Sequence, residues 1–192
     1  AILMQYSVLP PFIFGFLLTV FPRWLNLPAL TKWHYLPIGL GLLGGQLVLL
    51  VGLFGYPHLV LIGLFQITAG WVAGLIILFS VYRNTKQTTW HAISMLVALS
   101  FGLAGLILIL LSSGSGNATL MLAAIKIGTF ALLLPIYFTV CHRMLPFFAS
   151  CVLKDYRVYR PMWSLALFWA MALIHLGLEI AHLNAWLWLP DS

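Results

Sequence analysis

The chain has 192 residues, of which 63% are hydrophobic and only 6% are charged, and its mean hydropathy is +1.08. A soluble globular domain carries roughly 25% charged residues, so this composition excludes that class. The net charge of +6 comes from nine Lys and Arg residues against three Asp and Glu residues. Apolar runs of about twenty residues favour membrane-spanning helices, because a transmembrane β-barrel alternates apolar and polar residues over short segments.

Six hydrophobic runs are long enough to cross about 30 Å of hydrocarbon as α-helices. They extend over Leu3 to Phe21, Leu36 to Phe54, Leu59 to Tyr82, Ala92 to Leu111, Leu120 to Val140 and Met162 to Leu187. The sequence therefore predicts an all-α, polytopic transmembrane helix bundle that forms a single domain over residues 1–192. Two small-residue motifs, Gly41-x-x-x-Gly45 and Gly70-x-x-x-Gly74, predict close backbone packing. We expect this chain to be a piece of a longer protein, because it opens inside a hydrophobic run.

The basic residues fall almost entirely in the odd-numbered connections between the runs. Eight of the nine lie there, namely Arg23, Lys32, Arg83, Lys86, Arg143, Lys154, Arg157 and Arg160. The positive-inside rule therefore places the odd connections in the cytoplasm. The charge indicates orientation in a lipid bilayer, and we expect no nucleic acid as a partner.

The last run carries His175, Glu179 and His182 on one helix face, because they are spaced at i, i+4 and i+7. A carboxylic acid in hydrocarbon is costly unless it is paired, so this face should point into the bundle. The face is either a Glu–His packing surface or a metal site, haem site or proton relay. Imidazole suits iron and copper, and a carboxylate one turn away can accept the second ring N–H. A bis-histidine haem would need a ligand from another helix, and His58 is the only other histidine in the outer half.

A second candidate metal site lies near the cytoplasmic ends of the fourth and fifth runs. His91 and His142 are found there, and together with Cys141 and Cys151 they could form a His/Cys cluster suited to copper. The alternative is that these histidines only reach the aqueous interface from the helix ends.

Lys126 is the only basic residue within a run, and its depth matches that of Glu179. Each residue lies about 6–7 Å to the outer side of the middle of its run, at 1.5 Å per residue. We therefore predict an intramembrane ion pair between them. In the competing arrangement Lys126 reaches the outer interface and Glu179 is protonated against His175 or His182.

Two stretches of the chain resemble the NnrS family. The segment Gly15-Phe-Leu-Leu-Thr19-Val-Phe-Pro22-Arg-Trp24 is similar to a G-F-L-L-T-A-x-P-x-W pattern that ends an early helix of that family. The segment His142-Arg143-Met-Leu-Pro146-Phe147-Phe148 is similar to its G-R-x-x-P-F-F-T pattern. The resemblance implies the N-terminal half of a bacterial inner-membrane protein, whose remaining half would be a partner of this one.

The resemblance also implies haem and copper as cofactors and an association with nitric-oxide stress. On this hypothesis His175 and His182 are candidate cofactor ligands oriented by Glu179, Arg143 pairs a haem propionate or anchors the helix end, and His142 and Cys141 are candidate copper ligands. An ion-coupled transporter that uses Lys126, Glu179 and the histidines is the alternative function, and a scaffold subunit is a third. The residues themselves establish no cofactor and assign no reaction.

Overall fold

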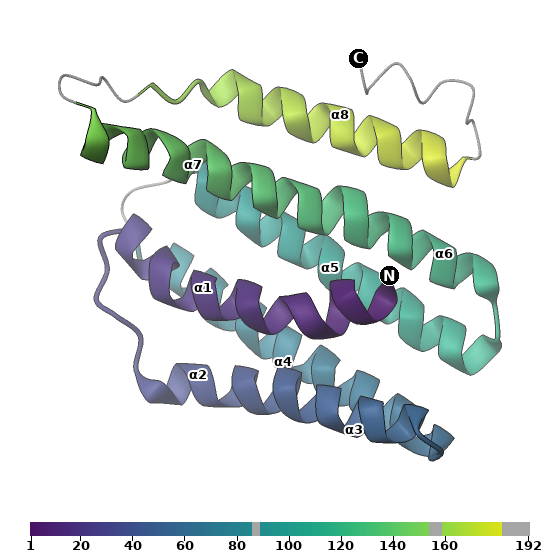
Figure 1. Cartoon of the computed structure of the whole chain (residues 1–192). Helices are drawn as coiled ribbons and strands as arrows, with labels where there is room; N and C mark the ends of the chain where they lie inside the picture. The colour runs from purple at the N-terminus through teal and green to yellow at the C-terminus, as the bar shows by residue number, and fades with distance from the viewer. Residues whose placement is uncertain (86–88, 154–158, 182–192) are drawn as a thin grey trace.

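The computed structural model describes residues 1–85, 89–153 and 159–181, and these residues form helices and no β-strand. Six helical rods cross the molecule in alternating directions, and three of them contain a π-helical segment (Figure 1). The elements are η1 (Met4–Val8), α1 (Leu9–Trp24), α2 (Lys32–Gly39), η2 (Leu40–Gly44), α3 (Gly45–Leu53), α4 (Pro57–Arg83), α5 (Trp90–Ser115), α6 (Ala118–Ile127), η3 (Gly128–Leu133), α7 (Leu134–Val152) and α8 (Met162–Ile180). The prediction of a six-span, all-α membrane protein is confirmed.

The fifth span is longer than predicted at its C-terminal end. Its helix does not stop at Val140 but continues as α7 to Val152, with Pro146 inside it. A proline removes one backbone donor, and the neighbouring turns can still carry the helix. Placing Arg143 in a connection was therefore wrong, since this residue lies on α7. The predicted end of the last span, at Leu187, lies outside the described residues, and α8 is described as far as Ile180.

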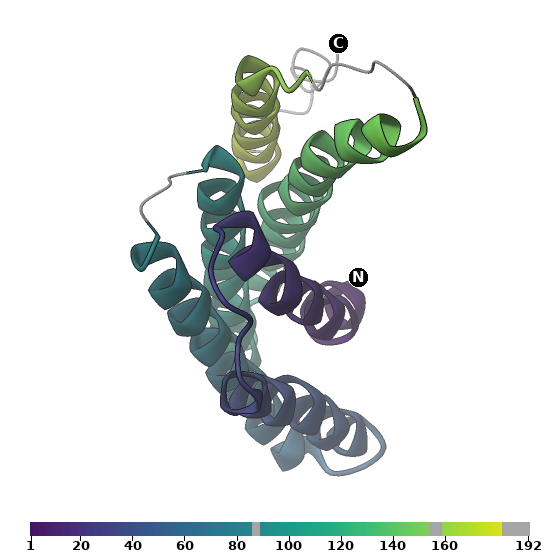
Figure 2. The same ribbon diagram turned by 90° about the vertical axis from the view of Figure 1, so that its left-hand side faces the viewer.

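From the α3–α4 hairpin at one edge, α5, the fifth span and α8 follow in chain order to the other edge, and α1 lies in the middle of the bundle (Figures 1 and 2). Helix α5 packs against α4, α6, η3 and α7, and α1 packs against α4. Helix α8 packs mainly against α6, η3 and α7 and is the least buried of the six spans. A side chain on its inner face therefore meets the fifth span.

Close backbone packing joins α3 and α4, as the glycine motifs predict. An added Cβ at Gly70 would lie 2.8 Å from the Cα of Gly41, and one at Gly45 would lie 2.7 Å from the backbone nitrogen of Ile67. Gly74 packs differently, because it faces the ring of Phe14 on α1. Three of the four motif glycines thus lie where η2 and α3 meet α4.

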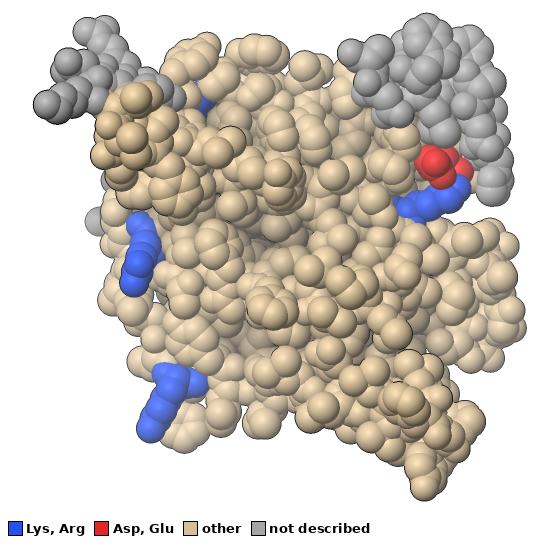
Figure 3. Space-filling view, viewed as in Figure 1, with Lys and Arg blue, Asp and Glu red and all other residues tan. Residues whose placement is uncertain are grey.

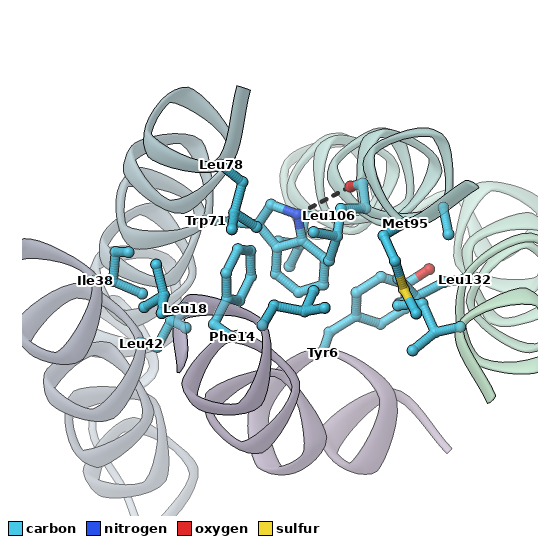
Figure 4. Close-up of a cluster of buried hydrophobic side chains, with 14 of the residues drawn as sticks. Tyr6, Phe14, Leu18, Ile38, Leu42, Trp71, Leu78, Met95, Leu106 and Leu132 are labelled. Atoms are coloured by element: carbon cyan, nitrogen blue, oxygen red, sulfur yellow. Dashed lines mark hydrogen bonds between the residues drawn. The ribbon is translucent and has the colours of Figure 1, made fainter. Parts of the chain in front are cut away.

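The rings of Tyr6, Phe14 and Trp71 lie among aliphatic side chains in a buried cluster at the centre of the bundle (Figure 4). Trp71 is fully buried, meets Phe14 edge to face at 5.3 Å, and donates from Nε1 to the Leu99 carbonyl at 3.0 Å. Tyr6 donates from its hydroxyl to the Ala124 carbonyl at 2.6 Å. Because hydrocarbon offers no water to these donors, the two bonds hold η1 against α6 and α4 against α5.

Candidate functional site

On the face shown in Figure 3, charged side chains lie at the two ends of the bundle, and the middle carries none. At one end, basic side chains lie near the connections that were predicted to be cytoplasmic. At the other end, one basic group lies directly beside an acidic one. Each end carries its own group of candidate functional residues.

The acidic group is Glu179, and its neighbour is Lys126. The Lys126 Nζ lies 2.7 Å from the Glu179 Oε2 and 2.7 Å from the backbone oxygen of the same residue. The two side chains are 23% and 25% exposed. This is the pairing predicted from equal depth, and it ties α6 to the end of α8.

His175 lies one turn before Glu179, on the same inward face of α8. Its ring centroid is 4.1 Å from that of Phe130 in η3, and its Nε2 is 3.9 Å from the Glu179 Oε1. The side chain is 13% exposed. His182 lies outside the described residues. His58 begins α4 beside the α3 turn, across the bundle from α8, so the structure does not bring it to His175 (Figures 1 and 2).

An apolar groove runs between the fifth span and α8, and His175 lies at one end of it. Its volume is about 470 Å³. Four aromatic residues line it together with aliphatic ones and a serine: Phe130, Leu134, Phe138, Trp163, Ser164, Leu167, Phe168, Met171 and Ala172. The rings of Phe138 and Phe168 stack in parallel at 4.1 Å. The groove thus offers flat apolar walls and one imidazole.

At the end that was predicted to be cytoplasmic, two histidines join three helices. The Nε2 of His91 lies 2.9 Å from the Nδ1 of His142, and the Nε2 of His142 lies 3.1 Å from the carbonyl oxygen of Pro161. Because a carbonyl only accepts, the Nε2 of His142 carries a hydrogen, and in the neutral ring its Nδ1 accepts from His91. The chain of bonds runs from the start of α5, through α7, to the residue that precedes α8.

The structure brings His142 to His91 but turns Cys141 elsewhere. The Cys141 thiol lies beside the hydroxyl of Tyr137, a residue that is 69% exposed on α7. Cys151 is exposed. Within residues 1–85, 89–153 and 159–181, no three His, Cys, Asp or Glu side chains come together in a way that could hold a metal ion.

Arg143 lies beside these histidines in the sequence and faces α1. Its guanidinium carbon is 4.7 Å from the ring centroid of Trp24, a cation–π contact on a largely buried indole. Thirteen residues separate Arg143 from Phe130, the neighbour of His175, which is about 20 Å of helix. The propionate role of Arg143 stays a prediction, and the separation places this guanidinium in a different part of the fifth span from the neighbour of His175.

The Trp24–Arg143 contact joins the two stretches that carry the family resemblance, although they are more than a hundred residues apart. In a comparison with models of known protein families, residues 1–190 match the family described as NnrS protein. The chain belongs to the NnrS family. No curated protein and no solved structure matches it.

Other polar contacts of this NnrS chain could not be found from its sequence. Trp169 donates from Nε1 to the Ser94 Oγ at 2.7 Å, and Ser94 lies 2.6 Å from the hydroxyl of Thr139. Thr139 in turn donates to the Pro135 carbonyl at 2.6 Å. Small hydroxyl residues are common in membrane helices, so no signal marks these two in advance. Phe130 also gave no signal, since a phenylalanine within an apolar run is ordinary.

Proposed function

We propose that this NnrS protein binds haem in the groove between the fifth span and α8, with His175 as an iron ligand. We also propose that it resides in the bacterial inner membrane and takes part in the response to nitric-oxide stress. The observation that carries the haem proposal is the position of His175, an imidazole at the end of an apolar groove with aromatic walls. Bound haem would supply an iron atom able to bind a diatomic ligand such as nitric oxide.

The residues around His175 fit such a role. Its ring is restrained by Phe130, and the Glu179 carboxylate lies 3.9 Å from its Nε2, close enough to orient the imidazole after a small movement. Lys126 holds that carboxylate in place at 2.7 Å. His182 stays a proposed second ligand and lies outside the described residues. We further propose that the remaining half of the chain packs against this side of the bundle.

Copper at His142 and Cys141 stays a prediction, and the described residues fit it poorly. Cys141 turns toward Tyr137, and both ring nitrogens of His142 are already used in hydrogen bonds. The charges of Arg143 and Arg160 act on His91, its partner, and two positive charges disfavour a metal cation at the same place. We therefore assign no copper-dependent step to these residues.

A visible absorption spectrum of the detergent-purified full-length protein tests the haem proposal. We expect a Soret band, and we expect His175→Ala to lower the haem content per protein. His58→Ala is the matched control, because His58 is an exposed histidine across the bundle, and it should retain haem. A spectrum without a Soret band after haem-supplemented expression would refute haem binding. Unchanged haem in His175→Ala would place the iron ligands elsewhere.

The Lys126–Glu179 pair also favours an ion-coupled transporter, since paired intramembrane charges are typical of ion paths. This function would give no Soret band. It would require that the protein in liposomes move protons or sodium together with a solute, and that Glu179→Gln abolish the coupling.

A further inference from the structure

Two arginines flank one hydrogen bond at the end of the bundle predicted to be cytoplasmic: Arg143 follows its donor, His142, and Arg160 precedes its acceptor, Pro161. Arg143 lies over the Trp24 ring. The positive charges of Arg143 and Arg160 repel each other, and both act on His91, which is only 2% exposed. Like charges held together near buried groups are unfavourable unless a group of opposite charge lies between them.

The described part of the chain supplies no such group there. Its one acidic side chain is Glu179, which pairs with Lys126 at the opposite end of the bundle. The Nε of Arg160 is buried and has no acceptor among the described residues. A buried guanidinium N–H gains free energy when it finds an acceptor, so this group is suited to donate to a bound anion.

The surrounding backbone adds to the positive potential. The His91–His142–Pro161 hydrogen bonds hold the first turns of α5 and α8 next to each other. Each helix N-terminus carries roughly half a positive charge and unpaired N–H groups. Thr89, the residue before α5, has a buried hydroxyl that also lacks a described partner. Two guanidiniums, two helix N-termini and a free hydroxyl therefore lie at one end of the bundle.

We propose that Arg143 and Arg160 bind a phosphate group at the cytoplasmic face of the membrane. A guanidinium offers parallel N–H donors that match the oxygens of a phosphate, and Arg143 is held in one direction by the indole beneath it. The phosphate belongs either to an anionic phospholipid of the inner leaflet or to a soluble phosphate. The site is about 20 Å along the fifth span from His175, so it is separate from the proposed haem groove.

The test uses delipidated full-length protein in detergent. Native mass spectrometry measures the binding of dioleoyl phosphatidylglycerol, and thermal unfolding with inorganic phosphate, without lipid, measures binding of the free anion. We expect Arg143→Gln and Arg160→Gln each to weaken phosphatidylglycerol binding by about tenfold or more, since each loses a charged hydrogen bond. Arg83→Gln is the control, because Arg83 is an exposed arginine at the same end, and it should bind as the wild type does.

Arg143→Lys separates folding from recognition, because it keeps the charge and loses the paired donors. Lipid binding that is weaker than wild type at an unchanged unfolding temperature supports the site. If inorganic phosphate raises the unfolding temperature of the wild type but not of either glutamine variant, the site is supported and its ligand is a soluble phosphate. Binding of both probes that is unaffected in Arg143→Gln and Arg160→Gln, or absent from the wild type, overturns it. Asp155→Asn, which removes the nearest acidic residue in the sequence, should not weaken either probe.

Discussion

Removing one partner of the Lys126–Glu179 pair should destabilise the protein more than removing both. Lys126→Met leaves the Glu179 carboxylate in apolar surroundings with no cation, and Glu179→Leu leaves the ammonium without its anion. Such losses cost about 3–5 kcal/mol for a fully buried pair and about 0–1 kcal/mol for an exposed one. The side chains are 23% and 25% exposed, so we expect about 2–3 kcal/mol for each single variant.

The double variant Lys126→Met/Glu179→Leu should lie within about 1 kcal/mol of wild type, because an apolar pair of similar volume replaces the ions. Equilibrium unfolding in mixed micelles of nonionic detergent and dodecyl sulfate measures all three variants. A double variant whose loss equals the sum of the two single losses would refute the reasoning, since it would show no coupling between the side chains.

Three further predictions concern packing and orientation. Gly70→Ala should lower the free energy of unfolding by about 2 kcal/mol or more, because its Cβ would lie 2.8 Å from the Cα of Gly41 and backbone cannot move aside. Gly39→Ala is the control in the same unfolding assay. It should be neutral or stabilising, because a Cβ at Gly39 would point into open space. Trp71→Phe should cost about 2 kcal/mol or more, because it removes the indole bond to the Leu99 carbonyl and leaves a cavity between α4 and α5; an unchanged unfolding midpoint would contradict this. Gly114→Cys, in a background without native cysteines, should react with an impermeant thiol reagent from the periplasm, and labelling only after permeabilisation would reverse the orientation.

Depth in the membrane could be predicted from the sequence, because it is a one-dimensional property. Counting residues from the middle of each apolar run was enough to place Lys126 and Glu179 at one level, and the structure has their charged atoms 2.7 Å apart. The number of spans follows from the same count. What a depth count cannot give is the direction in which a side chain points, nor the helix that it meets.

Most contacts that could not be predicted from the sequence depend on the direction in which a side chain points from its helix. Cys141 and His142 were treated as neighbours in one cluster, but adjacent residues on a helix point about 100° apart. Since α7 continues past both of them, only His142 can face His91. The contact of Trp24 with Arg143 joins segments more than a hundred residues apart, and no local pattern reports it. Only their shared place in the family patterns associated these two residues in advance.

The π-helical segment η3 allows one continuous helix to serve two different neighbours. It lies between Lys126, which faces α8, and Arg143, which faces α1. A π-turn acts like one inserted residue and rotates everything beyond it by about 100° relative to an uninterrupted α-helix. The segment therefore rotates the side chains of α7 about the helix axis relative to those of α6, so that the two ends of the span can face different helices. Deleting a single residue of η3 would leave both ends helical but turn one of them away from its neighbour.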